Sequence, residues 1–444
     1  MYKRINPELH RIIQIFNKNG LNYNLFKCEH IFEGENKNLD IIFRTIEDYN
    51  KASKILNKEN YLLYMSEKVE RYKKMYLLFK KEVVYAIHLH REVSWHGIIV
   101  LNKEKVFERA RNNIPSPEDS LLIHSAHALF ENFKISSFQR KLLAKYKKET
   151  KDKNYINSQL VKFGWKKEFY KFIKDFSITK RLIVQIYFSC LIKHPLSILT
   201  LGNKLFKYIR RKISLERKCY LIALIGVNGS GKTTLTHKLL EKYENLTRFM
   251  GIKQERYYFG WVPFSFIAKI ISKMFRRKAI FKETAVKSTV IKNNQKINKN
   301  KMFQELLFLY NFCEYLYRYI FTIYPKLRTR KLLISDRYFY DIYGQYPSAK
   351  KSIIVPLLFK LFPSPDLLII LDANTKTIMK RNKAGQNLKR NVFPKEYLDC
   401  QKERYKEIST MFNAPIIDTE NKLENNIDEI TSHSWNSIIK RVRL

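Results

Sequence analysis

A short stretch near the middle of the chain combines three glycines, a lysine and two threonines at a spacing that suits phosphate binding. It reads Gly226-Val227-Asn228-Gly229-Ser230-Gly231-Lys232-Thr233-Thr234 and fits the pattern G-x-x-x-x-G-K-[ST] at every fixed position. Glycines let the backbone curl so that successive N–H groups point at phosphate oxygens, and a following helix adds the positive end of its dipole. We expect Lys232 to reach the β- and γ-phosphates of ATP, and the Thr233 hydroxyl to bind Mg²⁺.

The residues on either side of this stretch support that interpretation. The apolar run 220–225 predicts a buried parallel strand, and Leu235, Leu239, Leu240 and Tyr243 recur at helical spacing. The alternative is a glycine-rich turn that carries a lysine by chance. A strand before the loop and a helix after it favour a nucleoside triphosphate site instead.

A carboxylate, a cation and an aromatic residue follow a second apolar run, 331–335. They are Asp336, Arg337 and Tyr338, and at the carboxyl end of a parallel strand they would lie where ligands bind in open α/β folds. Asp336 could hold Mg²⁺ or an acceptor hydroxyl, while Arg337 could pair with an acceptor phosphate. The alternative is a strand end that leaves a solvated ion pair.

Apolar runs and helical patterns alternate from Cys219 to the end of the chain. The run 367–371 predicts another buried strand, the helix after it carries Arg381, and 415–418 predicts a late strand. This alternation predicts an α/β fold for residues 218–444, with a P-loop NTPase parallel sheet and helices on both faces.

The order of these motifs resembles thymidylate kinase and its broader relatives over about residues 219–440. The set comprises the phosphate loop, Asp336-Arg337-Tyr338, Pro365-Asp366, Leu371-Asp372, Arg381 and Tyr405. The chain is most similar to kinase-like proteins of bacterial and archaeal surface-polysaccharide gene clusters. These share the extension Asp336-Arg337-Tyr338-Phe339-Tyr340-Asp341.

The resemblance implies a nucleoside monophosphate kinase-like enzyme that moves the γ-phosphate of Mg-ATP to a nucleotide, sugar or sugar-phosphate acceptor. It implies catalytic roles for Lys232, Asp336 and Arg337, and metal binding by Thr233 and Asp336. Arg381 would contact the adenine or belong to a lid. The acceptor would contact Arg256, Arg337, Tyr338 and Asp341. The segment 254–260 replaces the glycine-rich acceptor loop of thymidylate kinases, so we expect an acceptor other than plain thymidylate.

Residues 1–106 resemble the nucleotidyltransferases. The segment 34–43, with a helix after it, looks like the signature in which D-x-D ends a strand. That chemistry needs two or three carboxylates to clamp two metal ions. Asn38 stands at the first Asp position and His88 at the third, which leaves Asp40 alone. We therefore expect a small α+β nucleotidyltransferase-like domain without nucleotidyl transfer.

Residues 107–217 are predicted to form a helical region and a basic linker. Ser116 is expected to cap a helix that has Pro117 at its first position and Asp119 as a capping-box partner. Five histidines lie between residues 88 and 127: His88, His90, His96, His124 and His127. They could form a metal site, but no ligand spacing on one face is visible, which favours structural roles.

The chain is strongly basic, with 84 Lys and Arg against 41 Asp and Glu and a net charge of +43. The positive electrostatic potential that this charge creates would attract an acidic partner. Basic residues are dense in the segments 204–218 and 269–301. The alternatives to a small-molecule kinase are a nucleic-acid enzyme such as a polynucleotide 5′-kinase, or a peripheral membrane protein of surface-glycan synthesis. Coding bias toward lysine would also produce the charge. A homodimer is a further expectation.

The apolar segment 182–192 is too short to cross a bilayer, which takes about 20 residues. It predicts either a core helix or a basic amphipathic surface that lies on anionic lipid. The five cysteines are far apart and contain no C-x-x-C pair, which indicates neither a disulfide framework nor a zinc site. We expect a cytoplasmic location, with the inner face of the membrane as the alternative.

Overall fold

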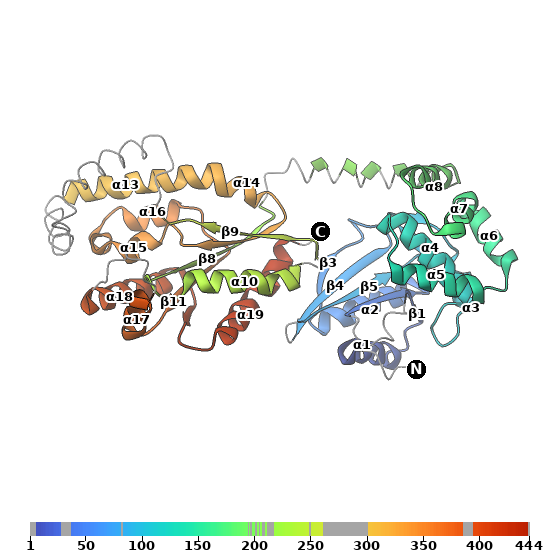
Figure 1. Cartoon of the computed structure of the whole chain (residues 1–444), viewed down its shortest axis with the longest axis horizontal. Coiled ribbons are helices and arrows are strands. Elements are labelled where there is room, and N and C mark those ends of the chain that lie inside the picture. The colour runs from blue at the N-terminus through green and yellow to red at the C-terminus, as the bar shows by residue number, and fades with distance from the viewer. Residues whose placement is uncertain are drawn as a thin grey trace. The chain divides into compact units, whose positions relative to one another are not determined.

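The computed structural model describes residues 6–27, 37–80, 83–193, 217–247, 250–260, 301–384 and 394–442, together with parts of 195–210. The chain forms two compact units, Met1–Ser214 and Leu215–Val442 (Figure 1). Each unit contains its own sheet and its own hydrophobic core.

The N-terminal unit contains a mixed five-stranded sheet in the order β1-β2-β5-β4-β3. Strands β2 and β5 are parallel, and the other neighbours are antiparallel. The strands are β1 (Tyr23–Leu25), β2 (Asn38–Phe43), β3 (Leu62–Met65), β4 (Lys73–Lys80) and β5 (Val83–His90), followed by the hairpin β6 (Ser94–Trp95) and β7 (Ile98–Ile99).

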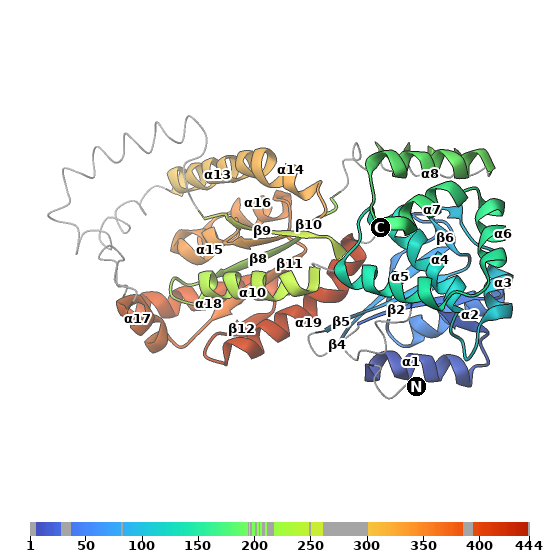
Figure 2. The same cartoon turned by 45° about the vertical axis from the view of Figure 1, so that its right-hand side comes forward.

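Helices cover both faces of this sheet. Leu39, Ile41 and Phe43 of β2 pack against the first two helices, whereas Ile42 packs in a core with the later helices (Figure 2). This alternation follows from the two-residue period of a strand. The helices are α1 (Pro7–Lys18), α2 (Ile46–Lys58), α3 (Lys103–Arg109), α4 (Pro117–His127), the π-helical turn η3 (Ala128–Asn132), α5 (Ser137–Glu149), α6 (Lys153–Phe163), α7 (Lys166–Asp175) and α8 (Lys180–Lys193).

The start of α4 confirms the predicted cap. The side chain of Ser116 accepts a hydrogen bond from the Asp119 N–H at 3.2 Å, and Pro117 occupies the first helical position. Pro117 fits there because its fixed φ is helical and its missing N–H would have no intrahelical partner. The Asp119 carboxylate accepts from the Ser116 hydroxyl at 2.7 Å rather than from the Ser116 backbone N–H, so Asp119 does not complete the predicted capping box.

The C-terminal unit is built on a five-stranded parallel sheet in the order β12-β11-β8-β10-β9, as the sequence predicts for a P-loop fold. Its central strand is buried along its whole length because neighbours flank it on both edges and helices cover both faces. The strands are β8 (Tyr220–Gly226), β9 (Lys253–Tyr258), β10 (Lys331–Asp336), β11 (Leu367–Asp372) and β12 (Ile416–Asp418).

Two groups of helices cover the two faces of the parallel sheet. Leu221, Ala223 and Ile225 of β8 share a core with aromatic residues of the helices that precede and follow β10. On the other face, the first and last helices of the unit contact β8 and each other (Figures 1 and 2). The helices are α10 (Lys232–Thr247), α13 (Lys301–Arg318), the π-helical turn η5 (Tyr319–Ile323), α14 (Tyr324–Leu327), α15 (Asp341–Gln345), the 3₁₀ turn η6 (Pro347–Lys351), α16 (Val355–Leu361), α17 (Thr375–Ala384), α18 (Lys395–Phe412) and α19 (Leu423–Val442).

A buried carboxylate joins three parts of this unit at the end of the sheet opposite the phosphate loop. Asp366 accepts from the backbone N–H of Leu221 at 2.8 Å and pairs with Arg217 at 3.1 Å and Arg441 at 2.7 Å. Its side chain is only 6% exposed, so each partner offsets part of the cost of burying the charge.

We expect Asp366→Ala to lower the free energy of unfolding of the C-terminal unit by about 1–3 kcal/mol, because it leaves the Leu221 N–H without its acceptor. Urea unfolding of the variant measures the change. Asp428→Ala is the control, since Asp428 is half exposed and forms a surface ion pair with Lys242. A surface pair contributes about 0–1 kcal/mol, so equal losses in the two variants would contradict the role given to Asp366.

Candidate functional site

The loop between β8 and α10 depends on glycine where the chain leaves the sheet. Gly226 has φ +149°, and a Cβ there would lie 2.4 Å from the carbonyl oxygen of Leu371 in β11. Gly229 has φ +92°, and its Cβ would lie 2.7 Å from Oδ1 of Asn382. Any side chain at these positions would push the loop away from its neighbours, which explains the glycines in structural terms.

Lys232 folds back over the loop at the start of α10. Its Nζ donates to the carbonyl oxygens of Gly226 at 2.8 Å and Val227 at 2.7 Å, and it lies 3.5 Å from the Ser230 hydroxyl. The residue is only 6% exposed. The ammonium is therefore held inside the curl of the loop, where the oxygens of a bound phosphate would lie next to it.

Asp336 ends β10 beside the loop, as predicted. Its Oδ2 accepts from the Thr233 hydroxyl at 3.0 Å and from Nη2 of Arg256 at 2.9 Å. The two strand ends are neighbours because β8 and β10 pair in parallel, with Asp336 opposite Leu224. The hydroxyl and the carboxylate thus lie side by side at the mouth of the loop, where they could hold a metal ion.

Arg337 leaves the strand in an unusual backbone conformation. Its φ is +76°, which a non-glycine residue rarely adopts and which turns the side chain toward the loop. The guanidinium donates to Asp341 through Nη1 and to Asn228 through Nη2. Burial would lower the pKa of Arg337, but the Asp341 carboxylate outweighs it and raises the pKa.

Asp341 is the residue that fixes this arginine. Its carboxylate also accepts from the Tyr405 hydroxyl at 2.6 Å and from Gln345 at 2.8 Å, and the residue is 1% exposed. Burial and the Asp341 charge raise the pKa of Tyr405 well above its usual value, so Tyr405 remains a donor. The chain of contacts runs from Tyr405 through Asp341 and Arg337 to Asn228.

Arg381 approaches the other side of the loop from α17. Its Nη1 donates to the Thr419 hydroxyl at 3.0 Å and its Nη2 to the Thr419 carbonyl at 2.8 Å, while Nη1 lies 3.5 Å from the carbonyl of Gly229. The next residue, Asn382, donates to the carbonyl of Asn228 at 3.2 Å. These bonds tie α17 and the segment after β12 to the phosphate loop.

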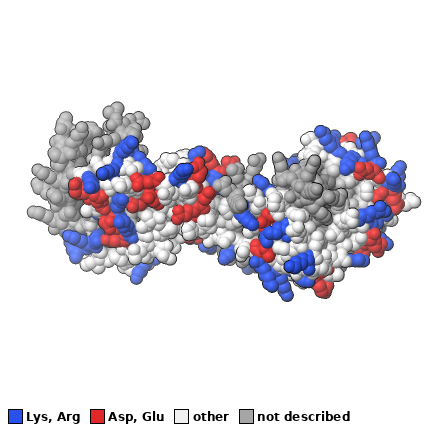
Figure 3. Space-filling view, turned by 90° about the horizontal axis from the view of Figure 1, so that it is seen from below, with Lys and Arg blue, Asp and Glu red and all other residues white. Residues whose placement is uncertain are grey.

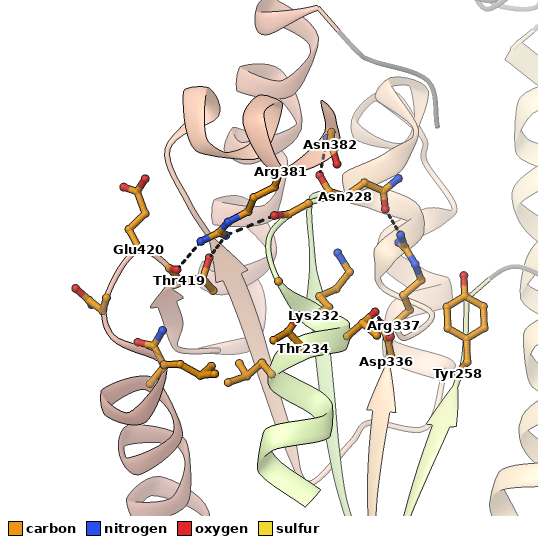
Figure 4. Close-up of a pocket in the computed structure, with 17 residues that line it drawn as sticks. Asn228, Lys232, Thr234, Tyr258, Asp336, Arg337, Arg381, Asn382, Thr419 and Glu420 are labelled. Carbon is orange, nitrogen blue, oxygen red and sulfur yellow. Dashed lines mark hydrogen bonds between the residues drawn. The ribbon is translucent and has the colours of Figure 1, made fainter. Parts of the chain in front are cut away.

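Lys232, Thr233, Asp336, Arg337 and Arg381 line one pocket of about 990 Å³ at the carboxyl edge of the sheet (Figure 4). In Figure 4, Lys232, Asp336 and Arg337 lie on one side of the loop, and Arg381 and Thr419 lie on the other. The lining residues are Asn228, Gly229, Gly231, Lys232, Thr233, Thr234, Leu235, Tyr258, Asp336, Arg337, Arg381, Asn382, Thr419, Glu420, Asn421, Leu423 and Asn426.

Comparisons with known proteins agree with this geometry. A family model described as thymidylate kinase matches residues 265–430, which is less than half of the chain and lies within the C-terminal unit. The C-terminal unit is thymidylate kinase-like. The match includes Asp336, Arg337 and Arg381, whereas the phosphate loop precedes it and is assigned from its own sequence and geometry. These findings support a nucleotide kinase-like phosphotransferase.

Among solved structures, a thymidylate kinase from Ehrlichia chaffeensis is similar at 15% sequence identity with a TM-score of 0.31. The similarity covers 48% of this chain and 98% of that chain. At so low a TM-score the similarity carries no argument, and the fold rests on the strand order and the parallel pairing. The chain matches no curated protein sequence.

The kinase-like pocket brings together most of the predicted site residues but not all of them. Tyr338, predicted to contact the acceptor, is fully buried in the core and donates to the carbonyl of Pro363 at 2.6 Å. Asp341 is buried against Arg337, and Arg256 binds Asp336 and His237. These three side chains are not among the lining residues. Tyr338 belongs to the core, where its ring packs against Phe259, Tyr340 and Phe362.

Sequence reasoning missed the wall formed by the segment after β12. Thr419, Glu420, Asn421, Leu423 and Asn426 line the pocket, yet only the strand before them was identified. The predicted strand 415–418 could have indicated this wall, because residues that follow a parallel strand lie at the ligand-binding edge of the sheet. The basic segment 269–301, apart from Lys301, lies outside the described residues.

The histidine prediction needs a correction. His96 stacks on Phe133 and His124 on Tyr146, which are packing roles as expected. His88 and His90, however, share one face of β5 and meet Asp40 of β2. The nucleotidyltransferase resemblance places His88 near Asp40, but the spacing of the histidines alone does not show the cluster, because the carboxylate comes from a strand some fifty residues earlier and parallel pairing brings it alongside.

Proposed function

We propose that the kinase-like unit transfers the γ-phosphate of ATP to a nucleotide, sugar or sugar-phosphate acceptor. One observation carries the proposal: Lys232, Thr233, Asp336 and Arg337 line the same pocket although they come from two segments about a hundred residues apart. A loop that only binds phosphate needs Lys232 and Thr233 but neither Asp336 nor Arg337. A pocket that also presents a carboxylate and a guanidinium suits transfer to a second substrate.

The protein's own groups would act by position and charge. The loop N–H groups and Lys232 bind the β- and γ-phosphates and stabilise the negative charge that builds on the transferred group. Arg337 is fixed by Asp341, so its planar fork can bind an acceptor phosphate without first losing conformational freedom. Arg381 and the wall after β12 would contact the nucleoside part of ATP.

Thr233 and Asp336 fit a Mg²⁺ ion. The two side-chain oxygens lie 3.0 Å apart, and hydroxyl and carboxylate oxygens are the ligands that Mg²⁺ prefers. When bound there, Mg²⁺ would neutralise charge on the β- and γ-phosphates. Arg256 donates to the same carboxylate oxygen and so helps to orient Asp336.

Lys232→Ala and Thr233→Ala should each weaken Mg-ATP binding by more than about tenfold, because a charge-assisted contact to phosphate or the hydroxyl ligand is lost. Calorimetric titration of the full chain measures the affinity. Lys238→Ala is the matched control, since Lys238 lies exposed on the same helix and pairs with Glu241. Equal affinities in wild type and Lys232→Ala would contradict the assignment of this loop.

Arg337→Lys should lower kcat/KM for the acceptor by at least about tenfold while ATP affinity stays unchanged, because lysine keeps the charge but not the fork. Transfer from γ-labelled ATP should be screened over nucleoside monophosphates, sugars, sugar phosphates and oligonucleotides. Tyr338→Phe is the control, since its hydroxyl bonds to the core and should not affect the acceptor. Transfer to oligonucleotides alone would favour the polynucleotide kinase alternative.

A second proposal concerns where this enzyme works, and it rests on α8. Leu182, Ile186 and Cys190 are buried, but the opposite stripe of the helix is also apolar. Val184, Phe188 and Ile192 on that stripe are 69%, 65% and 65% exposed. A surface helix of a globular protein normally presents polar residues on its outer face.

We propose that this outer stripe lies on an anionic membrane surface. Lys180, Arg181 and Lys193 are exposed at the two ends of α8, and basic ends around an apolar stripe match the charge of anionic lipid headgroups. On the face shown in Figure 3, Lys and Arg are interleaved with Asp and Glu. In the described part of the chain, no helix has the length and hydropathy to span a bilayer.

Replacing Val184, Phe188 and Ile192 by serine should weaken binding to vesicles that contain phosphatidylglycerol by more than about tenfold, because three apolar side chains no longer leave water. Vesicle sedimentation measures binding, and pure phosphatidylcholine vesicles should bind weakly. Val161→Ser is the control, since Val161 is exposed on α6 of the same unit. Concentration-dependent dimerisation through this stripe, with no vesicle binding, would overturn the proposal.

A further inference from the structure

The N-terminal unit contains a cluster of two imidazoles and one carboxylate at the centre of its sheet. Asp40 lies opposite His88 in the parallel register of β2 and β5, and His90 follows two residues later on the same face. Nε2 of His90 lies 3.1 Å from Oδ1 of Asp40, and Nδ1 of His88 lies 3.4 Å from the same oxygen. One ligand atom from each residue falls within 4.8 Å of the others.

These distances suit a small divalent ion. An ion with tetrahedral bonds of about 2.0–2.2 Å separates neighbouring ligand atoms by about 3.3–3.5 Å. The two separations given above, 3.1 and 3.4 Å, are close to that spacing before any adjustment of the side chains. The three ligands also come from adjacent strands of one sheet, whose hydrogen bonds fix the spacing.

The hydrogen bonding of the histidines points to a missing ligand. Both ring nitrogens of His88 and Nδ1 of His90 are buried, and within the described residues none of them has a hydrogen-bond partner. A buried polar atom without a partner costs about 1–3 kcal/mol. His90 is 1% exposed, so water does not offset this cost from outside. A metal ion would bind Nδ1 of His88 and Nε2 of His90, so it would supply the partner that Nδ1 of His88 lacks, and each neutral ring would carry its one proton on its other nitrogen.

We propose that Asp40, His88 and His90 form a binding site for a divalent transition-metal ion, with Zn²⁺ as the best match. Two imidazoles and a carboxylate suit Zn²⁺ and similar ions, whereas Mg²⁺ prefers oxygen ligands alone. The site therefore differs in chemistry from a two-magnesium nucleotidyltransferase centre. Three protein ligands leave a fourth position for water, and the ion cross-links β2 to β5.

Lys27 is the group that the ion has to displace. Its Nζ lies 3.2 Å from Oδ1 of Asp40, so the Lys27 ammonium already pairs with the carboxylate oxygen that the ion would bind. Lys73, the other nearby cation, already pairs with Glu131 at 3.2 Å. Wild type should therefore bind the ion in competition with Lys27, and removal of that ammonium should strengthen binding.

Co²⁺ titration of the full chain after chelator treatment tests the proposal, with Zn²⁺ as the competitor. Wild type should bind one Co²⁺ with the strong visible absorption of a tetrahedral, imidazole-bound ion, which an oxygen-bound ion elsewhere lacks. His88→Gln and His90→Gln should each weaken binding by at least about tenfold, because loss of an outer-shell partner alone costs that much. Lys27→Met should bind more tightly. His10→Gln, on α1, is the matched control.

A second measurement guards against misfolding of the variants. Zn²⁺ should raise the melting temperature of wild type and of His10→Gln but not that of His88→Gln, since an ion that binds only the folded site stabilises only the proteins that keep its ligands. The proposal is overturned if wild type and His88→Gln give the same Co²⁺ spectrum and affinity. Tetrahedral binding by Lys27→Met but not by wild type would also overturn it, because the ammonium would then be the resident cation.

Discussion

The burial of β8 on both faces and both edges is the constraint on which the rest of the kinase-like unit depends. A strand in that position cannot shift without exposing its apolar side chains, so the loop that leaves it at Gly226 has a fixed origin. Close contact with Leu371 excludes any side chain at that glycine. Parallel pairing then brings Asp336 from β10 and Thr419 from beyond β12 to the same edge. The pocket is a consequence of that register.

Charge is distributed around the pocket so that cations are oriented by buried carboxylates before any substrate arrives. Asp341 fixes Arg337, and Asp336 binds both Thr233 and Arg256. Leaving one of these groups unpaired in the interior would be costly, which makes the arrangement rigid. The extension that ends at Asp341 therefore has a structural purpose: it supplies the carboxylate that orients Arg337, while Tyr338 and its aromatic neighbours fill the core below.

In the N-terminal unit, strand pairing also decides which side chains meet, but it brings together a cluster of two histidines and an aspartate. Its sheet is also covered on both faces, and the side chains that face the later helices include Asp40, His88 and His90. In the kinase-like unit the buried carboxylates of Asp336, Asp341 and Asp366 each pair with an arginine, whereas in this cluster ring nitrogens lack hydrogen-bond partners among the described residues. The two units thus gather different side chains: a hydroxyl and a carboxylate beside the phosphate loop in one, and two imidazoles and a carboxylate in the other.

The sequence alone determined the features that depend on neighbours along the chain. The phosphate loop, the apolar strands around it and the cap at Ser116 require only local backbone geometry, so their patterns are legible. Tertiary structure decided which side chains meet. Tyr338 and Arg337 are adjacent in sequence, yet one fills the core and the other lines the pocket. Asp40 meets His88 only because two distant strands pair in parallel. Register and packing are long-range properties, and no local spacing encodes them.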